Sequence, residues 1–245
     1  MHTQARDFTI FVKQILNEYF INKIVLDVGS GDINGNNRFL FENCKYNGND
    51  VIEANNVTIV SKTKDLPFTD NTFDTIISTE CFEHDPEYKD SLNKIYKMLK
   101  PNGLFLFTCA STGRLEHGTR RTSMNDSYGT IGKLEDMHDY YKNLTEFDIN
   151  EVLNLNNSFS VWNTYYNYES KDLYFVGIKD GLGSQTKVCN LTMKDGLSDL
   201  KVSSLQKYSN DFVIETSLNT NIINVKNKYY VKNKSLYLYI HNLKK

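Results

Sequence analysis

The sequence contains few residues that cross-link or interrupt a fold: its 245 residues include 4 cysteines and 3 prolines. The cysteines, Cys44, Cys81, Cys109 and Cys189, form no Cys-x-x-Cys pair, which excludes the common zinc and redox motifs. We therefore expect four free thiols. No His, Asp or Glu residues cluster along the chain at the spacing of metal ligands, so we also expect no structural metal. The sequence leaves open a weakly bound divalent ion at the substrate site.

Long apolar segments are also missing. No run approaches the ~20 apolar residues that span a bilayer. The first residues, Met1 to Asp7, do not have the basic start and following apolar segment of a secretory signal. With 40% hydrophobic and 24% charged residues, the composition is that of a globular protein. We expect a cytoplasmic protein without a membrane partner.

The charge, −2 in total, is unevenly distributed. Residues 185–245 hold 10 lysines and 4 acidic residues, a local charge of +6, which leaves −8 for residues 1–184. An acidic surface does not suit nucleic acid, because phosphate binding needs basic side chains. We therefore expect no nucleic-acid partner for the first 184 residues.

The most informative segment is the run from Ile24 to Asp32, Ile-Val-Leu-Asp-Val-Gly-Ser-Gly-Asp. A short apolar stretch ends at an acid and a glycine turn, as where a buried parallel strand meets a ligand. Gly29 and Gly31 lack a Cβ, so the main chain can approach a ligand closely. Asp50 follows Gly31 by 19 positions and can accept hydrogen bonds from ribose hydroxyls. Taken alone, this turn also fits a dinucleotide fold or a purely structural glycine turn.

Four further segments narrow the choice. They are Asp65 to Phe68 (Asp-Leu-Pro-Phe), Phe73 to Glu80, the pair Glu83-His84, and Leu99 to Gly103 (Leu-Lys-Pro-Asn-Gly). With these motifs in this order and at these separations, the chain resembles the class I S-adenosylmethionine-dependent methyltransferases from about residue 1 to residue 181. The resemblance is closest to the type-11-like branch, which has Glu-His after the fourth strand and Leu-Lys-Pro-Gly-Gly before the fifth.

The resemblance implies that S-adenosyl-L-methionine is the cofactor. The residues that would bind it are Asp27, Gly29, Ser30, Gly31, Asp50, Thr63, Ser78 and Thr79. Asp27 would lie near the methionine end and orient the glycine turn, and Asp50 would bind the ribose. The sequence departs from the family pattern at Ile33, where a third glycine is usual, and at Lys62, where an acid often meets the adenine amino group.

Apolar periodicity predicts strands that alternate with helices, and hence an α/β fold: a doubly wound, mostly parallel, seven-stranded Rossmann-like sheet. The expected strands cover 23–28, 46–52, 57–61, 73–79, 104–109, 159–166 and 172–179, and the expected helices cover 5–20, 87–99 and 146–153. The last two strands would form an antiparallel hairpin, as the resemblance implies. In such sheets the ligand lies beyond the carboxyl ends of the strands.

A second region follows a glycine-containing linker at residues 180–184. We expect a methyltransferase domain at 1–181 and a small β-rich C-terminal extension at 185–245. The expected strands of the extension, rich in Val, Ile and Tyr, cover 186–193, 212–216, 221–226, 229–232 and 235–240. The extension could cover a sheet edge, form a homodimer or bind a partner.

Residues 110–145 form a long polar connection, and such connections in compact domains are usually functional or disordered. Methyl transfer to a hydroxyl usually needs a base, and histidine is the natural base at neutral pH. We select His84 and His117 as catalytic candidates, with His138 behind them, and consider the terminal His2 and His241 unsuitable. The candidates for substrate binding are Arg114, Glu116, Arg120, Arg121, Tyr140 and Asn143.

Each candidate also has a structural interpretation. His84 could cap the helix at 87–99 and line the cofactor site, and the arginines could belong to a solvated loop. Arg120 and Arg121 would otherwise bind a phosphate of the acceptor. The polar loop predicts an O-methyltransferase for a hydroxyl of a sugar, a glycan or another polar small molecule. The alternatives are a quinone-type small-molecule methyltransferase, and an inactive cofactor-binding scaffold whose extension binds a partner.

Overall fold

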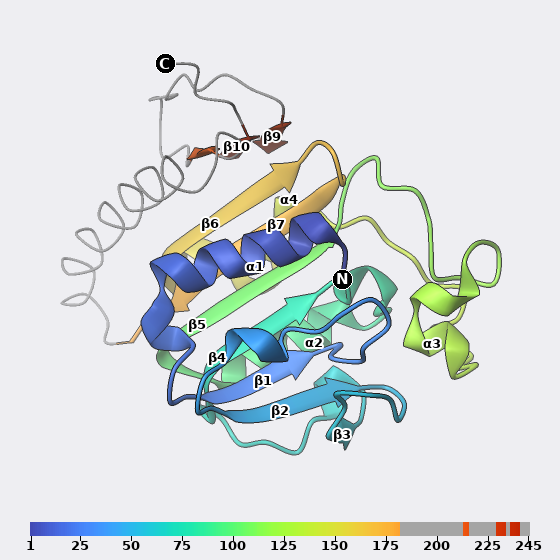
Figure 1. Ribbon diagram of the computed structural model, residues 1–245, viewed down its shortest axis with the longest axis horizontal. Helices are drawn as coiled ribbons and strands as arrows, with labels where there is room; N and C mark the ends of the chain where they lie inside the picture. The colour runs from blue at the N-terminus through green and yellow to red at the C-terminus, as the bar shows by residue number, and fades with distance from the viewer. Residues whose placement is uncertain (182–212, 216–228, 234–235, 241–245) are drawn as a thin grey trace.

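The computed structural model describes residues 1–181 and three short strands at 213–215, 229–233 and 236–240. Seven strands form one sheet in the order β3-β2-β1-β4-β5-β7-β6 (Figure 1). Their bounds are β1 Ile24–Val28, β2 Lys45–Asp50, β3 Ile59–Val60, β4 Phe73–Thr79, β5 Leu99–Ala110, β6 Phe159–Asn167 and β7 Asp172–Lys179. The first five strands pair in parallel, and β7 is antiparallel to both β5 and β6. The predicted doubly wound, mostly parallel sheet is confirmed.

Helices cover both faces of the sheet, as Figure 1 shows. The α-helices are α1 Thr3–Ile15, α2 Tyr88–Met98, α3 Tyr128–Ile131, α4 Glu146–Leu153 and α5 Leu155–Ser158; the 3-10 helices are η1 Asn17–Tyr19, η2 Arg38–Leu40, η3 Thr63–Asp65, η4 Phe82–His84 and η5 Met124–Asp126. The apolar face of α1, which includes Phe8 and Val12, packs in one core cluster with Ile77 and Val176. Helices α2 and α4 contribute to a second cluster on the opposite face of the sheet. Helices α1, α2 and α4 therefore each bury one apolar face on the sheet, as their periodicity predicts.

Most predicted boundaries lie within two residues of the observed ones, and two differ by five. Helix α1 ends at Ile15, five residues before residue 20, because the chain tightens into η1 and then buries Phe20 completely. Strand β5 begins at Leu99, before the Pro101-Asn102-Gly103 turn, because Leu99 already pairs with Phe73 across an irregularity in the register. Helix α4 matches its predicted range, and its N-terminus carries a capping box in which Thr145 and Asp148 bond reciprocally.

The carboxyl ends of β1, β2, β4 and β5 meet at one edge of the sheet, where ligands bind in this architecture. The segment that contains α3 stands beyond this edge, and the N-terminus lies near it (Figure 1). The topology therefore gathers the glycine turn, the Glu83-His84 pair and the polar loop in one region.

Strands β8 Val213–Glu215, β9 Tyr229–Asn233 and β10 Leu236–Ile240 form an antiparallel sheet in the order β8-β10-β9. β8 and β10 lie within predicted strands of the β-rich extension, and β9 runs one residue past its predicted range of 229–232. The predicted strands at 186–193 and 221–226, and Cys189, lie outside the described residues. Among the described residues, no helix combines the length and the apolar character needed to cross a membrane.

Candidate active site

A cavity of about 380 Å³ opens beyond the strand ends. Of the predicted cofactor residues, Asp27, Gly29, Ser30, Gly31, Asp50, Thr63 and Thr79 line it. Four residues predicted for the acceptor, His84, Arg114, Glu116 and His117, line the same cavity. Ser78 does not, because its hydroxyl is buried and donates to the carbonyl of Val28 at 2.9 Å. The same cavity is therefore lined by residues predicted to bind the cofactor and by residues predicted to bind or activate the acceptor.

The glycine turn packs too closely for side chains. Gly29 has φ +69°, and a Cβ there would lie 2.6 Å from both Cβ and Sγ of Cys81. A Cβ on Gly31 would lie 2.0 Å from a ring carbon of Tyr128, across the mouth of the cavity. The backbone N–H of Gly31 donates to Oδ2 of Asp50 at 3.0 Å, so the turn is held against the end of β2. Only glycine fits here, as the close approach of main chain and ligand requires.

A buried acid, Asp27, and a partly buried acid, Asp50, line the cavity beside the glycine turn. Asp50 also accepts from the backbone N–H of Val51 at 2.7 Å, while burial raises the pKa of its carboxyl group. Asp27 accepts hydrogen bonds from the Tyr46 hydroxyl and from the side-chain amide of Asn37. Burial raises the pKa of Asp27 to about 7, although these hydrogen bonds oppose the rise. The two acids thus stand at the ends of β1 and β2, close to the glycine turn.

Lys62, which stands where the family often has an acid, is engaged by other acids. Its Nζ lies 2.7 Å from Oε2 of Glu87 and also pairs with Asp136. The neighbouring Thr63 donates its hydroxyl to Oδ1 of Asn49 at 3.1 Å. Lys62 therefore ties the segment before η3 to α2 and to the polar loop, with its charge balanced by two carboxylates.

His84 and His117, which line the cavity where we place the acceptor, form an aromatic cluster with Tyr141. The rings of His84 and His117 meet edge to face, with centroids 4.9 Å apart, and Tyr141 contacts both. His84 is only 7% exposed; burial, assisted by His117, lowers its pKa to about 3. His84 is therefore neutral at physiological pH. His117 is less buried, and its Nδ1 lies 3.2 Å from the carbonyl oxygen of Leu115.

The remaining acceptor candidates lie outside the cavity. The Nε of Arg120 donates to both carboxylate oxygens of Asp139 at 3.1 Å, and Arg121 pairs with Glu116 at 2.8 Å. Both arginines are more than half exposed and are paired with acids of the polar loop, which they brace; their role in binding a phosphate stays a prediction. Tyr140 and Asn143 also lie off the cavity wall, and Asn143 donates to the carbonyl of Arg114 at 3.0 Å. His138 lies beside Asp139, also off the cavity wall.

His2, considered unsuitable from its terminal position, lines the cavity together with Glu80. Its Nε2 lies 2.7 Å from Oδ2 of Asp172 and 3.3 Å from Oε2 of Glu80. Burial alone would lower the pKa of His2, but the hydrogen bonds to Asp172 and Glu80 outweigh it and raise the pKa to about 10. Nothing in the sequence indicates this contact, because its three members belong to distant segments.

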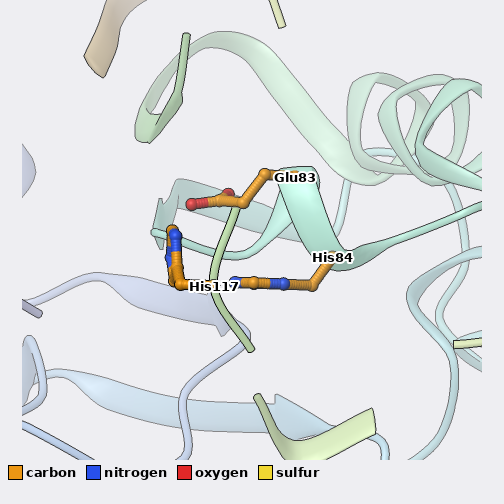
Figure 2. A group of neighbouring side chains, drawn as sticks. All are labelled: Glu83, His84 and His117. Carbon is orange, nitrogen blue, oxygen red and sulfur yellow. The ribbon is translucent and has the colours of Figure 1, made fainter. Parts of the chain in front are cut away.

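The structure also brings together two groups of possible metal ligands that the local sequence spacing does not indicate. Two groups of three residues bring one possible ligand atom each within 4.8 Å of the others: Glu83, His84 and His117, and His2, Glu80 and Asp172. In the first group, Glu83 and His84 extend from η4 toward His117 (Figure 2). Burial raises the pKa of Glu83 well above its usual value. Neither group has the local sequence spacing of a metal motif.

Part of this chain is similar in sequence to known proteins. Residues 26–107 match the profile of a family described as a methyltransferase domain. A malonyl-[acyl-carrier protein] O-methyltransferase 1 from Coxiella burnetii is 29% identical over 93 residues, which cover 38% of this chain and 32% of that protein. The alignment thus spans about a third of the length of this curated relative.

Solved structures share the fold at low identity. A phosphoethanolamine N-methyltransferase 2 from Haemonchus contortus, in complex with phosphomonomethylethanolamine and S-adenosylhomocysteine, is 15% identical with a TM-score of 0.50 and covers 71% of this chain and 52% of that one. A 1,6-didemethyltoxoflavin-N1-methyltransferase from Burkholderia thailandensis is 12% identical with a TM-score of 0.45, over 74% and 92% of the two chains. Over residues 26–107 the chain is therefore similar to the methyltransferase-domain family, and it shares its fold with the Haemonchus contortus enzyme.

Proposed function

We propose that this protein is an S-adenosylmethionine-dependent O-methyltransferase that acts on a hydroxyl of a polar, uncharged small molecule such as a sugar. One observation carries the proposal: a single cavity is lined both by the glycine turn with Asp50 and by His84 and His117. A bound cofactor and an acceptor would therefore share one space, as direct methyl transfer requires.

The part of the cavity beside the glycine turn suits an adenosyl group. The backbone at Gly29 and Gly31 leaves room for close approach, and the carboxylate of Asp50 lines the cavity where ribose hydroxyls would lie. Asp27 and Thr79, linked through Asn37, would lie near the methionine end. The acids of this part also favour the positive charge of a sulfonium cofactor.

The charges that line the cavity support a neutral acceptor. Its acidic residues are Asp27, Asp50, Glu80, Asp85, Glu116 and Asp126. Its two basic side chains other than histidine, Lys62 and Arg114, are engaged: Lys62 by two acids, and Arg114 by the carbonyl of Ser170 at 2.6 Å. A phosphorylated acceptor would therefore enter a negative site with its cations already paired, whereas a polyol would not be repelled.

Methyl transfer is an in-line displacement at the sulfonium carbon, with a neutral thioether as the leaving group. The enzyme must hold the acceptor oxygen about 3 Å from the methyl group and help it to lose its proton. We assign activation of the hydroxyl to the His84–His117 pair, because these two residues line the cavity with their rings in contact. Tyr141 backs both rings and restricts their orientation.

The test is a radiolabelled methyl-transfer assay with neutral sugars, the matching sugar phosphates and a hydroquinone as acceptors. We expect labelled product from a neutral sugar and a lower kcat/KM for its phosphate. Preference for the phosphorylated form would refute the charge argument, and preference for the hydroquinone would favour the quinone-type alternative. Cofactor binding without turnover of any acceptor would favour the inactive scaffold, with the C-terminal extension as its working surface.

A further inference from the structure

Beside His84 and His117 lies a buried carboxyl group, Glu83, that the proposed methyl transfer does not use. Glu83 and His84 are the last two residues of η4, directly after the fourth strand, and His117 lies in the polar loop. Gly118 allows the loop to approach: it has φ +68°, and a Cβ there would lie 2.6 Å from Cε1 of His84. The fold thus brings His117 and Gly118 into contact with the buried pair Glu83 and His84.

Two buried polar atoms of this group have no hydrogen-bond partner among the described residues: Oε2 of Glu83 and Nδ1 of His84. Glu83 is 0% exposed, and its other oxygen accepts from the backbone N–H of Ala110 at 3.1 Å. A buried acceptor left unpaired destabilises the fold unless another group binds it. The Glu83 carboxylate and the His84 ring both extend toward His117 (Figure 2). The three residues therefore bring possible metal-ligand atoms close to one another.

We propose that Glu83, His84 and His117 bind a divalent transition-metal ion such as Zn²⁺ in the part of the cavity where we place the acceptor. Two imidazoles and one carboxylate form a ligand set that suits Zn²⁺, Co²⁺ or Fe²⁺ better than Mg²⁺ or Ca²⁺, which prefer oxygen ligands. Three protein ligands leave at least one coordination position open. His84 and His117 both line the cavity, so this position faces it.

The charges around the group favour a cation. Glu80 and Asp172 act electrostatically on Glu83, and Glu80 and Asp126 act on His84, opposed by Arg114. The other three-residue group is less suitable, because His2 already forms ion pairs with both of its carboxylates. A metal ion bound by Glu80 and Asp172 would have to displace the protonated His2. A metal ion bound by Glu83, His84 and His117 would instead be a partner for the two unpaired atoms, Oε2 of Glu83 and Nδ1 of His84.

The geometry needs a modest contraction. The possible ligand atoms lie within 4.8 Å of one another, whereas bonds of about 2.1 Å in a tetrahedral site bring ligand atoms to about 3.4 Å from one another. Glu83 and His84 are held in the core by η4, so the movement falls to His117 on its loop. His117 is the least buried of the three and is free to make this adjustment.

The role of the ion rests on the proposed function. An acceptor hydroxyl bound at the open position would have a lowered pKa and would release its proton to solvent. The histidine pair would then activate the acceptor through the ion that it holds. Metal binding itself needs neither cofactor nor acceptor, so it can be measured separately from methyl transfer.

The experiment uses the full chain, freed of metal with a chelator and titrated with Co²⁺ by visible absorption and with Zn²⁺ by calorimetry. We expect one ion per chain, with the absorption of nitrogen and oxygen ligands. Glu83→Gln and His117→Ala should each weaken binding at least about tenfold, since changes outside the ligand set alone can cost that much. Because His117 lies on a loop, His117→Ala should disturb folding less than a substitution of the buried Glu83.

Two histidines serve as matched controls. His138→Ala, in the same loop but off the cavity wall, should bind the ion as wild type does. His2→Ala should also retain binding. The proposal is overturned if wild type binds no ion, if His2→Ala rather than His117→Ala loses it, or if cobalt shows thiolate charge-transfer bands. Cofactor binding by the metal-free chain, measured in parallel, tests the proposed function independently of the ion.

Discussion

Replacing His2 with glutamine removes the cation that two buried carboxylates share. Asp172 is 0% exposed at its side chain and Glu80 is 11% exposed, and both lie within 3.3 Å of the His2 ring. Glutamine can donate a hydrogen bond but carries no charge. The two acids would then be left with Arg114, whose Nη1 lies 3.6 Å from Asp172, as their neighbouring cation.

The expected loss of stability follows from the pKa. A rise from 6.5 to about 10 corresponds to about 5 kcal/mol, at about 1.4 kcal/mol for each pH unit. The His2 side chain is 24% exposed, so solvent screens part of this interaction. We expect His2→Gln to lower the free energy of unfolding by about 3 kcal/mol, as when one partner of a buried ion pair is removed.

The loss should depend on pH with a definite sign. A histidine whose pKa is raised on folding stabilises the protein fully below its unfolded pKa of 6.5 and loses that contribution as pH rises through about 10. The gap between wild type and His2→Gln should therefore be largest near pH 6.5 and shrink toward pH 10. Urea unfolding of both proteins across this range measures the gap.

A second variant separates the ion pair from simple packing. Asp172→Asn in the His2→Gln background removes one of the unpaired charges and should recover part of the lost stability. Equal stability of wild type and His2→Gln at pH 6.5 would refute the argument, and so would a gap that does not change with pH. The second result would show that His2 contributes by contact and not by charge.

Asp50→Ala should weaken binding of S-adenosylhomocysteine about 30- to 150-fold, because two charge-assisted hydrogen bonds are worth about 2–3 kcal/mol; calorimetry with the exposed Glu53→Ala as control checks this. Gly29→Ala should lower stability by about 2–4 kcal/mol, from a left-handed φ and a steric clash with Cys81, and denaturation should show a smaller loss for Gly35→Ala, which has a positive φ but no close neighbour. Truncation after residue 184 should leave a folded chain that binds the cofactor, since we propose that the methyltransferase domain ends near residue 181; an insoluble product or lost binding would move that boundary.

Local pattern was sufficient for most of the architecture. The strand from Ile24, the glycine turn after it and the capped helix from Glu146 are each encoded within a few consecutive residues. Apolar periodicity and turn chemistry act over such short distances, so they can be read without coordinates. Boundaries were less accurate where a neighbouring strand decided them, as at Leu99, whose pairing with Phe73 extends β5.

The sequence by itself determined the order of elements, the placement of the glycine turn and Asp50, and the candidacy of His84 and His117. Only the tertiary structure decided that Arg120 is neutralised by Asp139, that His2 reaches Asp172, and that Glu83 and His84 meet a histidine from a distant loop. The physical reason is the separation, along the sequence, of the residues that interact. Backbone propensity and periodicity depend on neighbours along the chain, whereas the partner of a charge and the burial of a side chain depend on segments that only folding brings together.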